Sequence, residues 1–167
     1  MRLDSSDIAL LNLLQSDSKK TAKELGISLD MPVTTVYAKI KRMEELGLVR
    51  QYATVLDGPK LGFAATAFIL ATFSYRTPGA TKNMLSQRAV AKEVAGFPEV
   101  LEVHVISGDW DLLIKVKTTD IDAVGRFVVD KLRTVGGIDK TVTCMVFDTA
   151  KETLEIDLKK HAVTQHQ

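Results

Sequence analysis

Apolar residues near the start of the chain recur at the three- and four-residue steps that place them on one face of a helix. The predicted helices cover residues 4–16, 21–29 and 32–47. Asp4 can cap the first helix, and Thr21 can cap the second. Asp7 lies in the first turn of the first helix, where a negative charge interacts favourably with the helix dipole. The apolar face predicted for the third helix comprises Val33, Val36, Ile40, Met43 and Gly47.

The stretch after the third helix has the composition of a strand. It is "LVRQYATVLD", and the glycines and proline of "GPKLG" next to it indicate a turn and linker. Three helices followed by a strand are typical of a winged helix-turn-helix domain. We therefore expect this domain over residues 1–50, and a connecting strand and linker over residues 51–62.

Beyond residue 62 the apolar pattern predicts two similar blocks, each made of a strand, a helix and a strand. The predicted strands are 64–76, 100–107, 110–118 and 140–148, and the predicted helices are 82–98 and 119–137. The residues expected to point inward from these helices are Leu85, Val90, Val94, Val124, Phe127, Val128, Leu132 and Val135. The order βαββαβ indicates an α+β class with a ferredoxin-like sandwich over residues 63–152, before a C-terminal tail over residues 153–167.

Such a sheet is covered by helices on one face only. The strand segments "AFILATF", "VHVI" and "CMVF" nevertheless offer apolar residues to both faces. An uncovered apolar face favours a partner, and pairing of two sheets would hold two helix-turn-helix domains at a fixed spacing on DNA. We therefore expect a homodimer, and we expect Cys144 in the last segment to be a small buried residue.

The third helix also carries the tightest basic cluster, "KIKR". Its polar side is small, hydroxylated and aromatic near the start and cationic further along. Short side chains let a helix approach base edges, while Lys and Arg reach phosphates. Taken alone, such a cluster is most often a solvated helix face; the preceding helix, the short turn and the hydroxyl-rich start make DNA binding an equal alternative. The candidate DNA-binding residues are Thr34, Thr35, Tyr37, Lys39, Lys41 and Arg42.

Composition narrows the class of protein. The chain has 167 residues, of which 46% are hydrophobic and 26% charged, as in a globular protein with a buried core. Its start lacks the apolar region of an export signal, and its longest uncharged, mostly apolar run is shorter than the roughly 20 residues that span a bilayer. We expect a cytoplasmic protein without a membrane partner. The net charge of +1 argues neither for nor against nucleic acid, so any basic surface must be local.

Four segments resemble the leucine-responsive/asparagine-regulator (Lrp/AsnC) family of prokaryotic transcription regulators. They are "LDSSDIALLNLLQSDS", "VTTVYAKIKRMEELGLV", "DGPKLGF" and "SGDWDLLIKV", within residues 3–152. The resemblance implies a winged helix-turn-helix joined to a ligand-binding domain, dimers that assemble further to tetramers or octamers, and small amino acids as effectors between dimers. The chain has Pro32-Val33 where the family usually has Ser-Pro, so base contacts cannot be copied, and the tail "LKKHAVTQHQ" has no counterpart.

The turn "SGDWD" is the candidate effector site. A zwitterionic amino acid needs a carboxylate for its ammonium, hydroxyl or N–H donors for its carboxylate, and an apolar wall. A tight hairpin connection explains the same glycine and acids, but the chain's only tryptophan is not required there. The resemblance favours Asp111 as the more structural acid, which leaves Asp109 for the ligand. The candidate effector-binding residues are Gly108, Asp109, Trp110, Asp111, Thr141 and Thr143.

The sequence offers no set of residues for catalysis. It has no zinc-ligand spacing, no glycine-rich phosphate loop and no legible Ser-His-acid set, so we expect no enzyme activity, no metal and no cofactor. The alternative function is an amino-acid-sensing regulatory subunit of a metabolic enzyme that acts without DNA. The basic cluster, which such a subunit does not require, favours double-stranded DNA as the partner.

Overall fold

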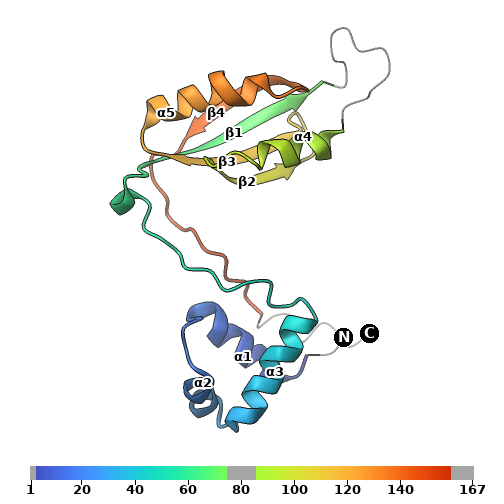
Figure 1. The fold of residues 1–167 in the computed structure, drawn as a ribbon, viewed down its shortest axis with the longest axis vertical. Coiled ribbons are helices and arrows are strands. Elements are labelled where there is room, and N and C mark those ends of the chain that lie inside the picture. Colours follow the sequence, from blue (N-terminus) through green and yellow to red (C-terminus); the bar gives the residue numbers. More distant parts are fainter. Residues whose placement is uncertain (1–2, 75–85, 159–167) are drawn as a thin grey trace. The chain divides into compact units, whose positions relative to one another are not determined.

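The computed structural model describes residues 3–74 and 86–158. The chain forms two compact units, which are coloured along the sequence in Figure 1. Residues 1–55 and 151–167 belong to the first unit, and residues 56–150 form the second. In the described part of the chain, every helix is too short or too polar to cross a membrane.

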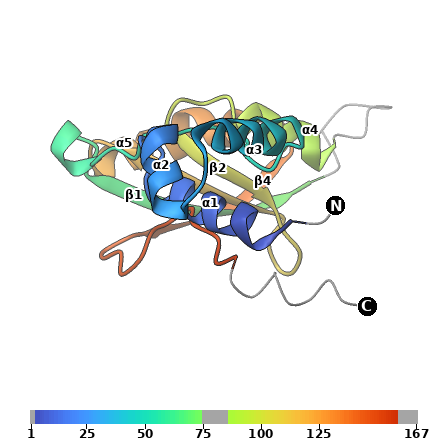
Figure 2. The same cartoon turned by 90° about the horizontal axis from the view of Figure 1, so that it is seen from below.

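The first unit is built on three helices, which are visible together in Figure 2. They are α1 (Ser5–Ser16), α2 (Ala22–Leu29) and α3 (Val33–Glu45), in agreement with the predicted ranges. Both predicted caps are present: Asp4 with Asp7, and Thr21 with Glu24, form reciprocal capping boxes. The buried apolar core comprises Leu10, Leu11, Leu14, Ala22, Leu25, Val36 and Met43.

The turn between α2 and α3 is tight and depends on Gly26. The Met31 amide donates to the Gly26 carbonyl at 2.8 Å, and Asp30 adopts a left-handed φ of 49°. A Cβ atom on Gly26 would lie 2.6 Å from the Met31 carbonyl oxygen, too close for any other residue without a shift. This close approach fixes the path of the chain into α3, as a helix-turn-helix requires.

The strand expected after α3 does not form within the chain. Gly47 ends the helix with a left-handed φ of 69°, as predicted, and the Leu48 amide donates to the Met43 carbonyl. Residues 50–57 then have no strand hydrogen bonds to any described residue. The prediction of a strand here was wrong for the single chain, because strand-forming side chains become a strand only when another strand accepts and donates the backbone hydrogen bonds.

The second unit is a four-stranded antiparallel sheet with helices on one face, which confirms the ferredoxin-like βαββαβ fold and the α+β class. The strand order is β2-β3-β1-β4. Its elements are the short helical turn η1 (Pro59–Leu61), β1 (Ala65–Phe73), α4 (Gln87–Val94), β2 (Val100–Val105), β3 (Leu112–Thr118), α5 (Ile121–Arg126) and β4 (Ile138–Met145). A wide turn at Phe127–Lys131 and a tight turn at Leu132–Thr134 extend α5.

The face of the sheet under α4 and α5 holds the core. The residues predicted to point inward are buried, from Val90 and Val94 of α4 to Val135 after α5; Leu85 lies outside the described residues. Alternate residues of β1, including Ile69, are buried against these helices. The rings of Phe97 and Phe127 meet edge to face, with centroids 5.7 Å apart.

No described helix of the second unit covers the opposite face of the sheet. The strand register places Phe68 and Leu70 of β1 beside Cys144 and Val142 of the edge strand β4. Cys144 is exposed, so the expectation that it is buried was wrong for the single chain. It faces outward because none of the described helices covers this side and β4 is an edge strand of the described sheet.

Part of the C-terminal tail belongs to the first unit. The side-chain amide of Gln15 in α1 accepts from the Ile156 amide at 2.8 Å and donates to the Ile156 carbonyl at 3.1 Å. Leu158 packs against the apolar core of the three helices. Residues 151–158 thus return the chain from β4 to α1, while residues 159–167 of the predicted tail lie outside the described part.

Candidate functional site

The six candidate DNA-binding residues all lie on α3, but they are not equally exposed. Thr34, Tyr37, Lys41 and Arg42 are exposed, whereas Thr35 and Lys39 are half-buried. Pro32 occupies the cap position before the helix, and its fixed φ of −56° suits a helix start. The sequence therefore places short and aromatic side chains toward the start of α3 and cations further along it.

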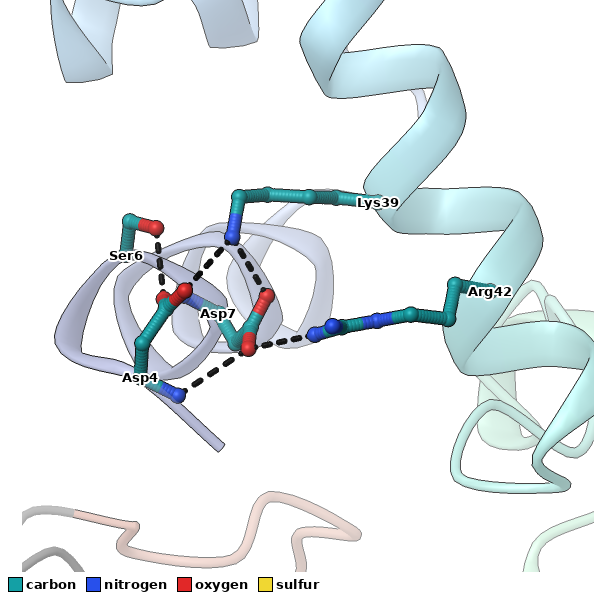
Figure 3. Close-up of polar contacts among 5 residues, drawn as sticks. All are labelled: Asp4, Ser6, Asp7, Lys39 and Arg42. Carbon is teal, nitrogen blue, oxygen red and sulfur yellow. Dashed lines mark hydrogen bonds and ion pairs between the residues drawn. The ribbon is translucent and has the colours of Figure 1, made fainter. Parts of the chain in front are cut away.

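A buried carboxylate of α1 holds two of these cations, as Figure 3 shows. Asp7 is fully buried. The Lys39 ammonium donates to Asp7 Oδ1 at 2.8 Å and to Asp4 Oδ2 at 2.9 Å, and Arg42 Nη2 donates to Asp7 Oδ2 at 2.6 Å. The Asp4 amide donates to Asp7 Oδ2 at 3.0 Å, so both carboxylate oxygens have partners.

These contacts stabilise the charged form of each group. Burial alone would raise the pKa of Asp7, but Lys39, the Asp4 amide and Arg42 together hold it below the usual value of a carboxyl. The Ser6 hydroxyl, followed by Lys39, lowers the pKa of Asp4. Burial opposes the charge on Lys39, yet its two carboxylate partners raise its pKa. Asp4, Asp7 and Lys39 are therefore charged at neutral pH.

The three cations of α3 consequently differ in what they can reach. The Lys39 side chain is 17% exposed and its ammonium lies between two carboxylates, whereas the Arg42 side chain is 48% exposed. The Lys41 side chain is 78% exposed, and only a loose contact of 3.8 Å joins it to Glu45. Sequence reasoning grouped the three as equivalent.

Sequence reasoning also missed Asp7 as a partner of the basic cluster. From the pattern alone it is an acid in a first turn, where acids are common. A signal was available, because Asp7 shares the buried face of α1 with Leu10, Leu11 and Leu14 at steps of three and four residues. An acid on the apolar face of a helix requires a cationic or N–H partner from another element.

The turn between β2 and β3 is closed by Asp111. Gly108 has a φ of 121°, which only glycine adopts readily, and the Ile106 amide donates to the Asp111 carbonyl at 2.9 Å. The Asp111 carboxylate accepts from the Phe73 amide at the end of β1 and from the Gln87 side chain at the start of α4, each at 2.7 Å. Asp111 therefore ties three elements together.

Asp109, two residues earlier, is in the opposite situation. It is exposed and has no hydrogen bond or ion pair to any residue in the described ranges, and Trp110 beside it is half-buried. Thr143 is exposed and Thr141 half-buried; the register sets them opposite Ile69 and Ala71 of β1. The turn thus presents an unpaired carboxylate next to an aromatic ring.

Among the described residues, the turn and the two threonines lie on different strands of the sheet. Ala71 of β1 pairs with Leu112 of β3 on one side and with Thr141 of β4 on the other. Since neighbouring strands lie about 4.8 Å apart, these two outer strands are about 10 Å apart. Two cavities of the second unit, of about 490 Å³ and 630 Å³, are lined by other residues.

Both halves of the chain match known family models. Residues 3–50 match a model described as winged helix-turn-helix DNA-binding, and residues 80–156 match the Lrp/AsnC ligand binding domain.

Relatives and solved structures agree with these matches over nearly the whole chain. An uncharacterized HTH-type transcriptional regulator of Pyrococcus abyssi is 40% identical over 152 residues, which cover 91% of this chain and 97% of the relative. The crystal structure of a transcriptional regulator from Neisseria meningitidis in complex with L-Met superposes with a TM-score of 0.86 at 27% identity, covering 96% of this chain and 99% of that one. An AsnC family regulator from Agrobacterium tumefaciens gives a TM-score of 0.83 at 26% identity, covering 95% and 99%.

Proposed function

This chain belongs to the Lrp/AsnC family of transcription regulators, and on that premise we propose how its two units divide the work. The N-terminal helix-turn-helix binds double-stranded DNA, and the C-terminal unit is the ligand-binding domain. The alternative of an enzyme's regulatory subunit acting without DNA is not favoured, because the matched relatives are transcriptional regulators. A regulator of this kind acts where the chromosome lies, so we place it in the cytoplasm and assign it no catalytic step.

We propose that the outward side of α3 enters the major groove. Thr34, Thr35 and Tyr37 lie toward the N-terminal end of α3, where side chains of a recognition helix meet base edges. Lys41 and Arg42 reach phosphates, because their side chains are the exposed cations of the cluster. Lys39, which carries the same charge, serves mainly to hold α3 on α1.

The ligand proposed for the C-terminal unit is a small amino acid. The observation that carries this proposal is the contrast between the bound Asp111 and the unpaired Asp109. In the proposal Asp109 pairs with the ligand's ammonium, Trp110 forms the apolar wall, and Gly108 allows the ligand to approach the backbone. The L-Met bound by the neisserial regulator supports this class of ligand and makes methionine the first to try.

We propose that the site is completed by assembly. Because β1 separates Thr141 and Thr143 from the turn in the described part of one chain, hydroxyl donors for the ligand's carboxylate come from a neighbouring chain. Homodimers form through the open sheet face around Phe68 and Val142, and they associate further to tetramers or octamers. An exposed apolar sheet face of this kind favours such contact.

A thermal-shift screen against the twenty standard amino acids, followed by calorimetry, tests the ligand assignment. We expect Asp109→Asn to weaken binding of the scoring amino acid by about tenfold, because a charge-assisted contact is lost. Asp130→Asn is the matched control, since Asp130 is also exposed but belongs to the Phe127–Lys131 turn that extends α5 and not to the turn between β2 and β3. Equal affinity in wild type and Asp109→Asn would place the ligand elsewhere.

A further inference from the structure

We propose that Asp7 is a positioning residue for DNA binding, which acts by fixing the guanidinium of Arg42 toward a DNA phosphate. The inference rests on the proposed function, in that α3 is taken to meet DNA. Asp7 is fully buried, lies in α1 and does not itself face the nucleic acid. Its contribution to binding passes through the residue that it holds.

Lys39 and Arg42 differ in how many of their N–H donors remain available to another molecule. Lys39 is enclosed between Asp4 and Asp7, at 2.9 and 2.8 Å, and its side chain is largely buried. Arg42 gives Nη2 alone to Asp7. A guanidinium carries five N–H donors in a rigid plane, so the remaining donors stay available on a half-exposed side chain.

The contact with Asp7 orders the Arg42 side chain in the free protein, before it binds a phosphate. A free arginine on a helix surface loses rotamer freedom when it binds, and that loss subtracts from affinity. Arg42 loses the freedom when the protein folds, because the 2.6 Å contact to Asp7 fixes the end of its side chain. A planar group held at one corner can still offer its other edge to an anion.

If Asp7 positions Arg42, Asp7→Asn changes the DNA affinity in the direction opposite to the one expected from charge alone. Asp7→Asn removes a negative charge near DNA, so charge alone predicts tighter binding. If Asp7 positions Arg42, the same substitution weakens binding, because Arg42 must then be ordered at the cost of affinity. Asp4→Asn is the matched control: it removes the same charge, Asn remains a good helix cap, and Asp4 does not contact Arg42.

The experiment measures the affinity of the full chain for a fluorescent duplex of about 30 base pairs, long enough for two half-sites one helical turn apart, across a range of salt concentrations. We expect Asp7→Asn to bind about tenfold more weakly, from two arginines to be ordered per dimer. Arg42→Gln should flatten the log-log salt slope by roughly 0.9 per lost phosphate contact. In the Arg42→Gln background, Asp7→Asn should cause no further loss, whereas independent effects would add.

Folding is checked by helical circular dichroism and thermal unfolding, with affinities measured where every variant is folded. If Asp7→Asn does not fold, Arg42→Lys decides, because lysine keeps the charge but has no second edge to offer; we expect about tenfold weaker binding from it. A folded Asp7→Asn that binds DNA as tightly as wild type or more tightly overturns the proposal, and so does an unaffected Arg42→Lys. A wild-type chain that binds no duplex overturns the assignment of α3 instead.

Discussion

The two units differ in whether the acidic residues of their candidate sites all have partners within the described chain. In the N-terminal unit, Asp7 is buried and both its oxygens are occupied by groups of the same chain. In the C-terminal unit, Asp111 is occupied in the same manner, but Asp109 beside it is exposed and without a partner among the described residues. In the proposal above, the DNA-contacting side chains come from one chain's first unit, whereas the site in the second unit is completed by a ligand and a neighbouring chain.

The largest expected effect is a loss of stability of the N-terminal unit when a cation that pairs with the buried Asp7 is removed. Lys39→Ala should lower its free energy of unfolding by about 3 kcal/mol, because the buried Asp7 loses one of its two cations. Lys41→Ala, whose side chain is exposed, should change it by less than about 0.5 kcal/mol. Denaturant unfolding followed by helical circular dichroism measures the free energy of unfolding of each variant. Similar losses in the two variants would mean that Lys39 and Lys41 contribute equally to stability.

A smaller loss of stability is expected in the C-terminal unit when Asp111, which closes the turn between β2 and β3, is substituted. Asp111→Ala should lower the free energy of unfolding by about 2 kcal/mol, since two short hydrogen bonds to a charged group are lost. Asp109→Ala should stay within about 0.5 kcal/mol of wild type. Trp110, the only tryptophan, reports this unit by fluorescence. Equal destabilisation by both variants would remove the distinction between a structural and a ligand-binding acid.

Acid should weaken the N-terminal unit through the same network. The folded pKa values of Asp4 and Asp7 lie below their unfolded values, so their stabilisation is present above about pH 4 and is lost as the pH falls below it. We expect the midpoint of thermal unfolding to fall on acidification in wild type and to fall less in Asp7→Asn. A parallel fall in both proteins would mean that other carboxyls dominate.

The smallest effect concerns the segment that returns from the second unit to the first. Gln15→Ala removes both hydrogen bonds to Ile156 at an exposed position, which should cost about 1 kcal/mol. Amide hydrogen exchange at Ile156 is the sensitive measurement, and it should become faster in this variant. Unchanged exchange would show that Leu158 and its apolar contacts hold the segment without Gln15.

Local features of this fold could be predicted from the sequence. The caps at Asp4 and Thr21, the end of α3 at Gly47 and the inward residues of α5 depend on neighbours within a few positions, which the apolar period and the cap residues record. The order of strands and helices predicted the ferredoxin-like sheet for the same reason.

The features that sequence reasoning missed depend on contacts between distant residues. Asp7 and Arg42 are separated by 35 positions, and Gln87 is 24 positions from Asp111, so no local pattern records either pairing. The wrong predictions for Cys144 and for the strand after α3 have a related cause. Both assumed a covering or pairing surface that the described residues of one chain do not supply.

The most direct test of the division of work is the DNA affinity of the full chain with and without each amino acid. We predict that at least one amino acid changes the dissociation constant for the duplex by about fivefold or more, a typical coupling between two sites. Asp109→Asn should lose this response and keep the affinity of the ligand-free chain. DNA binding that is the same with every amino acid, or a response that persists in Asp109→Asn, would contradict the account.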